Sequence, residues 1–172
     1  EHGRSWVDRP GTQEGMCTSY EESARIPLIM RYPKRLPPGT VWKSGVSLVD
    51  LHPTIMDIAN IRPVYSMLFR TFPQIQGTSL IDRVNNGRDE WTDPVVIENV
   101  PQRAIDGAIY DERAIRDERY KLILRKFENR PEIRQPELYD LKSDPGETKN
   151  IYASRAAVVK RLARSLVTWG EK

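Results

Sequence analysis

The second half of the chain carries the clearest periodic pattern. Apolar and polar side chains alternate over residues 120–125, with an interruption at Ile123, and a second short β-favouring run covers residues 138–141. Alternation with a period of two places successive side chains on opposite faces of a sheet. The pattern therefore predicts two strands, with Lys121 and Arg125 on the polar side of the first.

Turn residues flank these predicted strands. Asp117-Glu118 fits a hairpin turn before the first strand, and Asp144-Pro145-Gly146 closes the second. Proline presets φ at the second position of a turn, and glycine accepts the positive φ that a turn often requires. A third apolar run at 95–100 predicts a further strand, so residues 93–147 read as an antiparallel meander.

Two amphipathic helices are predicted outside the meander. Ser47 and Asp50 have the spacing of a capping box, and Ser154 can cap a closing helix. Apolar side chains follow each cap at intervals of three and four residues, which is typical of a helix that packs one face against a sheet. The first stripe contains Leu48, Leu51, Ile55, Ile58 and Ala59, and the second contains Val159, Leu162, Leu166 and Trp169.

The remaining stretches have weaker patterns. Residues 1–25 are polar and predict a loop with a short helix at 20–24. Residues 26–32 form an apolar run that fits a buried strand, with Pro27 near its start where a ladder hydrogen bond is not needed. Residues 62–92 show no steady period, which favours an insertion or a linker.

The identities of the residues in these elements say more about the protein than the spacing of their apolar positions does. The meander reads Arg-x-x-Arg-Tyr-Lys-Leu-Ile, then Glu-Leu-Tyr-Asp-Leu, then Asp-Pro-Gly-Glu-Thr-x-Asn before the closing helix. This order resembles the C-terminal subdomain of the type I, formylglycine-dependent sulfatases. Further matches in the family's order lie at residues 19–29, 38–41, 46–55 and 76–80, so the resemblance covers nearly the whole chain.

The resemblance implies an α/β fold of the alkaline-phosphatase-like sulfatase type, of which this chain is the C-terminal part with a small antiparallel sheet and a closing helix. It implies that residues 1–61 end the core domain, that 62–92 are a linker or insertion, and that 93–172 are the C-terminal subdomain. We therefore expect a missing N-terminal half of the sulfatase as a partner of this chain.

The family's catalytic nucleophile is not encoded in this chain. It is a formylglycine made from the cysteine of a Cys-x-Pro-x-Arg motif, whereas Cys17 is followed by Thr18-Ser19-Tyr20. Many members also place a sulfate-binding lysine four residues before the Tyr-Glu-Glu motif, where this chain has Met16. A thioether cannot donate a hydrogen bond or neutralise an oxyanion. We expect no catalytic residue in this chain, and no activity from the chain alone.

Glu1 and His2 are the candidate metal ligands. Glu1-His2-Gly3 resembles the family's Asp-His-Gly or Asp-Asn-Gly motif, which supplies two ligands to a divalent cation, usually calcium. A hard cation accepts either carboxylate, although glutamate carries one more methylene than aspartate. Two alternatives stay open: the pair corresponds to a second His-Gly pair found downstream in many members, or His2 is a loop histidine without a ligand.

Composition limits the other classes of function. The 172 residues carry 27 Lys and Arg against 24 Asp and Glu, a net charge of +3, so nothing favours a nucleic-acid partner. No apolar stretch approaches the roughly 18 residues that a membrane span needs. The residues leave the compartment open, and only the resemblance favours a periplasmic, extracellular or lysosomal site.

Two hypotheses follow from the sequence. The first is the C-terminal portion of a sulfatase, a metal-dependent sulfuric ester hydrolase of sulfated carbohydrates or aryl sulfates. The second is a non-catalytic stand-alone module, or a degenerate remnant that keeps a binding or structural role. A nucleic-acid binder that uses the closing helix is a weaker third class.

Overall fold

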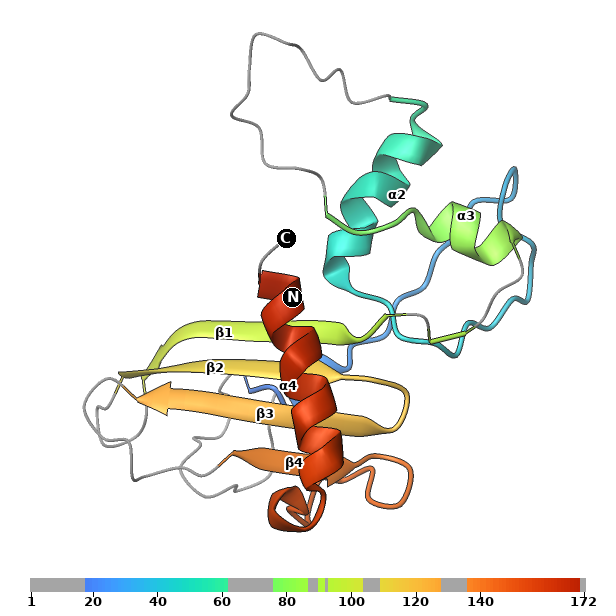
Figure 1. Cartoon of the computed structure of the whole chain (residues 1–172). Helices are drawn as coiled ribbons and strands as arrows, with labels where there is room; N and C mark the ends of the chain where they lie inside the picture. Colours follow the sequence, from blue (N-terminus) through green and yellow to red (C-terminus); the bar gives the residue numbers. More distant parts are fainter. Residues whose placement is uncertain are drawn as a thin grey trace, which may run out of the picture. The chain divides into compact units, whose positions relative to one another are not determined.

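The computed structural model describes residues 18–61, 76–86, 90–91, 93–103, 109–127 and 136–170. They divide into two compact units, one from residues 1–28 and 93–172 and the other from residues 29–92. The first unit holds a sheet and helix α4, and the second holds helices α2 and α3 (Figure 1). Among the described residues, no helix has the length and apolar character to cross a membrane.

The sheet of the first unit is an antiparallel meander. Its strands, in the order in which they pair, are β1 (Val95–Arg103), β2 (Ile109–Arg116), β3 (Tyr120–Phe127) and β4 (Glu137–Asp140). The amide of Asp117 donates to the carbonyl of Tyr120 over 3.0 Å, so the predicted hairpin turn between β2 and β3 is confirmed. The meander predicted from the alternating pattern is therefore present.

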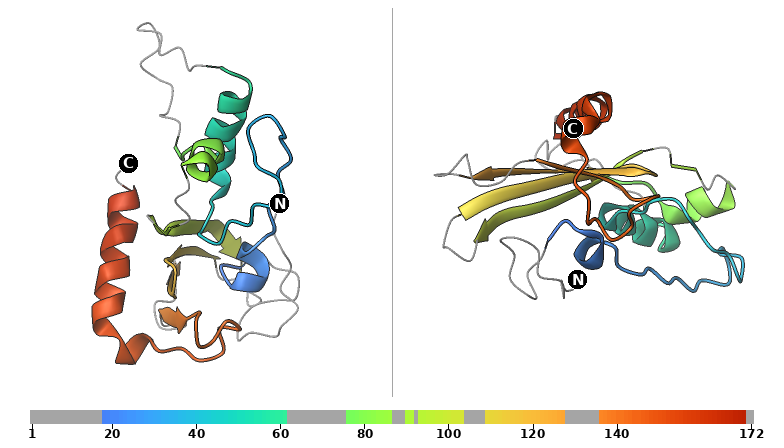
Figure 2. Two further views of the ribbon diagram at one scale, coloured as in Figure 1. Left: turned by 90° about the vertical axis from the view of Figure 1, so that its right-hand side faces the viewer. Right: turned by 90° about the horizontal axis from the view of Figure 1, so that it is seen from below.

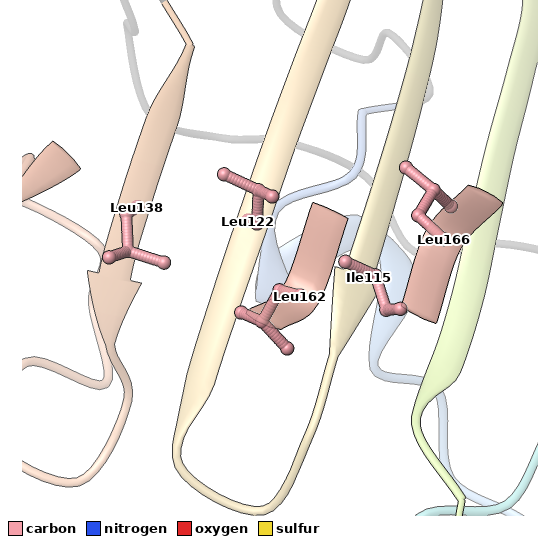
Figure 3. Close-up of a cluster of buried hydrophobic side chains, with 5 residues drawn as sticks. All are labelled: Ile115, Leu122, Leu138, Leu162 and Leu166. Carbon is pink, nitrogen blue, oxygen red and sulfur yellow. The ribbon is translucent and has the colours of Figure 1, made fainter. Parts of the chain in front are cut away.

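The register of the strands builds one apolar face. Ile115 on β2 pairs with Leu122 on β3, and Leu122 pairs with Leu138 on β4. Helix α4 (Ala156–Gly170) crosses this face and buries Leu162 and Leu166 against it (Figure 3). The prediction for the closing helix is thus confirmed for Leu162 and Leu166, and Val159 packs partly buried against the same cluster, whereas Trp169 is not part of it.

The start of the closing helix differs from the prediction. The hydroxyl of Ser154 donates to the carbonyl of Ile151 over 3.0 Å, within the 3-10 turn η2 (Tyr152–Ser154). Helix α4 begins only at Ala156. The prediction that Ser154 caps the helix is therefore wrong, because the serine hydroxyl is engaged in the preceding turn.

The opposite face of the sheet is covered by the N-terminal segment. The short helix α1 (Glu21–Ala24) confirms the helix predicted at 20–24. Figure 2 shows α1 and α4 on opposite sides of the sheet. A segment near the start of the chain and the last helix therefore enclose the same strands.

In the second unit, one aspartate organises the helices. Asp50 and Ser47 form the predicted capping box, which opens the 3-10 turn η1 (Leu48–Asp50) and helix α2 (Leu51–Ile58). The second carboxylate oxygen of Asp50 accepts from the amide of Thr78 over 2.9 Å. The following helix, α3 (Leu80–Asn85), was not predicted from the sequence, because six residues are too few to show a helical period.

A glycine permits this contact between α2 and the chain before α3. Gly77 has a φ of 90°, and a Cβ at that position would lie 2.5 Å from the carbonyl oxygen of Val49. A residue with a side chain would meet both a backbone clash and backbone strain there. The glycine at position 77 is thus explained by the close approach of its backbone to that of Val49.

Two predictions for the second unit are wrong. Residues 26–32, which enter it from the first unit, contain no strand, and Ile29 is 92% exposed. The stripe on α2 is not buried, since Leu48 is 58% and Ile55 is 63% exposed. Both patterns are typical of elements whose apolar side chains are covered by a neighbouring layer.

Removing a core side chain tests the packing of α4. Leu162→Ala should lower the free energy of unfolding of the first unit by about 2–5 kcal/mol, because Leu162 is fully buried and alanine leaves a cavity. Val167→Ala on the same helix is the control, since Val167 is 63% exposed and should change stability by less than about 0.5 kcal/mol. Urea unfolding followed by circular dichroism measures both, and equal losses would contradict this packing.

Candidate functional site

The sheet face that meets the N-terminal segment carries charged side chains beside a small apolar cluster. Every second residue of β2, β3 and β4 points to this face, and the apolar ones among them are Ala114, Ile123 and Tyr139. The charged members are Glu112, Arg116, Lys121, Arg125 and Glu137. A buried charge is costly unless it is paired and hydrogen-bonded, so the partners of these groups decide what the face can do.

Lys121 is fully buried, and its ammonium group meets three oxygens. It donates to the carbonyl of Ser19 over 2.8 Å, and it lies 2.7 Å from Glu21 Oε1 and 3.0 Å from Glu147 Oε1. An ammonium group has three donors, so its bonding capacity is matched here. The alternating pattern predicted Lys121 on a polar strand face. In the structure the N-terminal segment covers this face, so Lys121 is not exposed to solvent.

Glu147 reaches this cluster from the turn after β4. The amide of Glu147 donates to the carbonyl of Asp144 over 3.1 Å, which confirms the turn predicted at Asp144-Pro145-Gly146. The positive φ of this turn falls on Glu147, at 54°, and not on Gly146 as predicted. This backbone conformation is unusual for glutamate, and it accompanies a side chain that is buried beside Lys121.

The carboxylate of Glu147 also holds the N-terminal segment. Its Oε2 accepts from the amide of Glu21 over 2.6 Å. Burial raises the pKa of Glu147 by more than the neighbouring Lys121 lowers it. Asp144 stabilises the turn from outside, because its carboxylate accepts from the amides of Thr148 and Lys149 over 2.9 and 2.8 Å.

Arg125, four residues after Lys121 on the same face of β3, forms a second buried cluster. Its guanidinium group is paired with the carboxylates of Glu112 and Glu137, and its side chain is 1% exposed. Burial disfavours the charge of Arg125, but the two carboxylates outweigh this effect and raise its pKa. Glu112 also accepts from the amide of Ser19 over 2.8 Å, so this cluster too contacts the N-terminal segment.

Two tyrosines complete the second cluster. The hydroxyls of Tyr20 and Tyr139 donate to Glu137 Oε2 over 2.7 and 2.9 Å, and their rings meet edge to face with centroids 6.1 Å apart. The guanidinium carbon of Arg125 lies 5.5 Å from the ring centroid of Tyr20, a cation–π distance. Burial raises the pKa of Tyr20 to about 12, and burial together with Glu137 raises that of Tyr139.

The two clusters fasten residues 19–21 to the sheet. Backbone atoms of Ser19 and Glu21 and the hydroxyl of Tyr20 all bind buried charged side chains. The segment itself covers the face, so the arrangement suits an anchor for the N-terminal segment. The Tyr-Glu-Glu motif is the sequence signal at this segment, but the partners of Tyr20 and Glu21 lie 117 and 126 positions away in the chain.

The structure does not describe the residues that the sequence predicted for metal or sulfate binding. Glu1, His2, Met16 and Cys17 are outside the described residues, so the metal assignment stays a prediction. Within the part of the chain that the structure describes, no group of three or more His, Cys, Asp and Glu side chains is arranged to hold a metal ion. His52 is exposed on α2.

The four-stranded antiparallel sheet and the closing helix agree with the fold that the sequence predicted, the C-terminal part of a sulfatase of the alkaline-phosphatase-like type. The family model described as N-sulphoglucosamine sulphohydrolase, C-terminal, matches residues 16–172, and the chain belongs to this family.

Curated relatives and solved structures agree with this assignment. An N-acetylglucosamine-6-O-sulfatase of Bacteroides thetaiotaomicron is 33% identical over 88% of this chain and 24% of its own length. An ulvan-active sulfatase of Formosa agariphila is 24% identical over 90% of this chain and 34% of its own length. This chain thus spans only about a quarter to a third of these relatives.

Among solved structures, a protein in complex with its substrate D-glucosamine-2-N,6-O-disulfate is 30% identical, with a TM-score of 0.64 over 90% of this chain and 30% of its own. A Bacteroides fragilis protein assigned to the sulfatases has a TM-score of 0.63 at 24% identity, over 88% of this chain and 30% of its own. The second likeness shows the shared fold.

Replacing the buried lysine tests the anchor. Lys121→Met should lower the free energy of unfolding by about 3–5 kcal/mol, because Glu21 and Glu147 would lose the cation between them. Arg113→Met on β2 is the control, since Arg113 pairs with Glu98 at the surface and should cost at most about 1 kcal/mol. Urea unfolding of both variants decides the matter, and an unchanged midpoint for Lys121→Met would refute the anchor.

The tyrosine cluster predicts a loss of stability at alkaline pH. A folded-state pKa of about 12 for Tyr20 lies above the ordinary value of about 10. The fold therefore favours the neutral phenol, and this contribution is complete below pH ~10 and disappears as the pH rises through ~12. Spectroscopic titration of tyrosinate should show the late ionisation, and Tyr20→Phe should remove part of it. Ionisation of every tyrosine near pH 10 in the folded protein would contradict this.

Proposed function

We propose that this chain is the C-terminal portion of a metal-dependent sulfuric ester hydrolase that acts on sulfated carbohydrates or aryl sulfates. Membership in the sulfatase family over residues 16–172 is the observation that carries the proposal. The named relatives act on sulfate esters, and one neighbour was solved with a sulfated glucosamine. A sulfated sugar is accordingly the substrate class that we propose for the complete protein.

In this proposal the chain supplies structure and the rest of the sulfatase supplies the nucleophile. Residues 1–61 end the core domain, 62–92 link or extend it, and 93–172 form the C-terminal subdomain. Glu1 and His2 would hold a divalent cation, usually calcium in this family, together with acids from the N-terminal half. The cation would supply charge neutralisation of the sulfate group when bound.

The anchor gives the C-terminal subdomain a role in this scheme. The chain between the proposed ligands and the sheet is fastened at Ser19 and Glu21 by buried charges on β2, β3 and the 144–147 turn. Fixing one end of a loop reduces the number of conformations that its remaining residues can adopt. The subdomain would therefore order the loop that carries Glu1 and His2.

The alternative function is a non-catalytic module or a degenerate remnant. Met16 favours it, because this position holds a sulfate-binding lysine in many sulfatases and methionine cannot take that role. A remnant would keep the fold and its anchor without turning over substrate. Activity of the complete protein separates the two functions.

An activity assay tests the proposal in two forms of the protein. The complete protein should release sulfate from 6-O-sulfated glucosamine or an aryl sulfate, and a chelator should lower the rate. The 172-residue chain alone should show no turnover above a buffer blank, because it lacks the nucleophile motif. Chelator-sensitive turnover by the chain alone would refute this assignment of roles, and an inert complete protein that carries formylglycine would favour the remnant.

A further inference from the structure

We propose that the outward side of helix α4 binds a sulfated glycan chain through Lys160, Arg161 and Arg164. These three residues are called the basic face of α4 below. The choice of a sulfated glycan as the partner rests on the proposed function, whereas the basic face itself is a feature of the fold. The face lies within the first unit, because α4 belongs to it as a whole.

The positive charge of the chain is concentrated in the segment that contains this helix. Residues 148–170 hold five Lys and Arg and neither Asp nor Glu. The whole chain has 27 basic and 24 acidic residues, so this segment alone accounts for the positive net charge. A local excess of one sign raises the concentration of oppositely charged ligands near it. The closing segment is therefore the part of the sequence that favours an anionic partner.

Helical geometry brings the three cations together on one side. Lys160 and Arg161 precede Arg164 by four and three residues, the spacings at which side chains are neighbours on a helix. All three are exposed. Leu162 and Leu166 point the other way, to the sheet, and Figure 2 shows no other described part of the first unit over the outward side of α4. The cations thus form a row about 6 Å long that faces outward.

Most of the charge of this face is not neutralised within the protein. Arg161 Nη2 lies 2.6 Å from Asp117 Oδ2, yet the Arg161 side chain is still 54% exposed. Lys160 and Arg164 form no ion pair or side-chain hydrogen bond with any residue that the structure describes. Like charges at this spacing slightly destabilise a helix. A bound anion would remove this repulsion, so the face is suited to a ligand with more than one negative group.

A sulfated glycan fits the basic face better than a membrane or a nucleic acid. A helix that lies on a membrane inserts its apolar side, but the apolar side of α4 is buried against the sheet. Single-stranded nucleic acids are bound by stacking on aromatic rings, and the exposed neighbours here are Val167 and Thr168. Sulfate oxygens accept charge-assisted hydrogen bonds from ammonium and guanidinium groups. The substrate class proposed above would bring such groups to the protein.

Binding of heparin, a densely sulfated glycan, to the 172-residue chain tests the inference by titration calorimetry. Lys160→Gln/Arg164→Gln should lower the affinity at least about tenfold in low salt, because two charged donors are lost. Arg25→Gln/Lys34→Gln is the matched control, since it removes the same charge at two exposed positions outside α4. It should lower the affinity by less than about threefold, because distant exposed charges are screened.

Several outcomes would overturn the inference. They are an unaltered chain that does not bind heparin, equal losses in the two double variants, and equal affinity for desulfated heparin. Duplex DNA that binds as tightly as heparin would also overturn it, in favour of a nucleic-acid partner. Both double variants should keep the melting temperature of the unaltered chain, since all four positions are exposed.

Hydrolysis measured on the complete protein keeps this inference separate from the proposed function. Lys160→Gln/Arg164→Gln should leave the release of sulfate from a small aryl sulfate unchanged, because such a substrate is too short to reach along α4. A complete protein that hydrolyses no sulfate ester but binds heparin through the basic face refutes only the hydrolase. Hydrolysis without loss of heparin affinity in the variant refutes only the glycan-binding face.

Discussion

The ammonium group of Lys121 is the constraint on which the first unit depends. It is fully buried, so it needs oxygen partners on every side, and it takes them from three separate parts of the chain. The backbone of Ser19, the carboxylate of Glu21 and the turn residue Glu147 must all be in place at once. Lys121 on β3 therefore positions both the N-terminal segment and the turn after β4. Apolar contacts are less directional and would fix these positions less precisely.

The two faces of the sheet are stabilised by different physics. Leu162 and Leu166 pack against Ile115 and Leu122. Burial of apolar area stabilises this contact, and it requires no particular orientation of the side chains. On the other face, a buried ion pair such as that of Arg125 with its carboxylates typically contributes little more than a well-packed apolar core, but losing one partner leaves a costly buried charge. One face thus supplies stability, and the other supplies the specific docking of residues 19–21.

The sequence predicted the elements of the sheet face under α4 better than those of the charged face. The period of a helix and the alternation of a strand indicate directly which side is apolar, and Leu162 and Leu122 were predicted to be apolar positions in this way. Alternation cannot tell a solvated polar face from a paired one, because the carboxylate partners of Lys121 come from distant turns and loops. The positive φ of Glu147 was missed for the same reason, since its cause is a tertiary contact. Glu1 and His2 rest on the resemblance alone.

The anchored residues 19–24 are followed directly by the apolar run at residues 26–32, so the anchor fixes one end of that run. Residues 19–24 are fixed by buried hydrogen bonds and a helical turn, and residues 26–32 follow directly. Fixing one end of a segment removes part of the entropy that its association would otherwise lose. Because Lys121 and Glu112 bind the backbone of Ser19, the apolar run leaves the sheet from a fixed point. The charged clusters on the sheet thereby restrict the conformations that the residues after α1 can adopt.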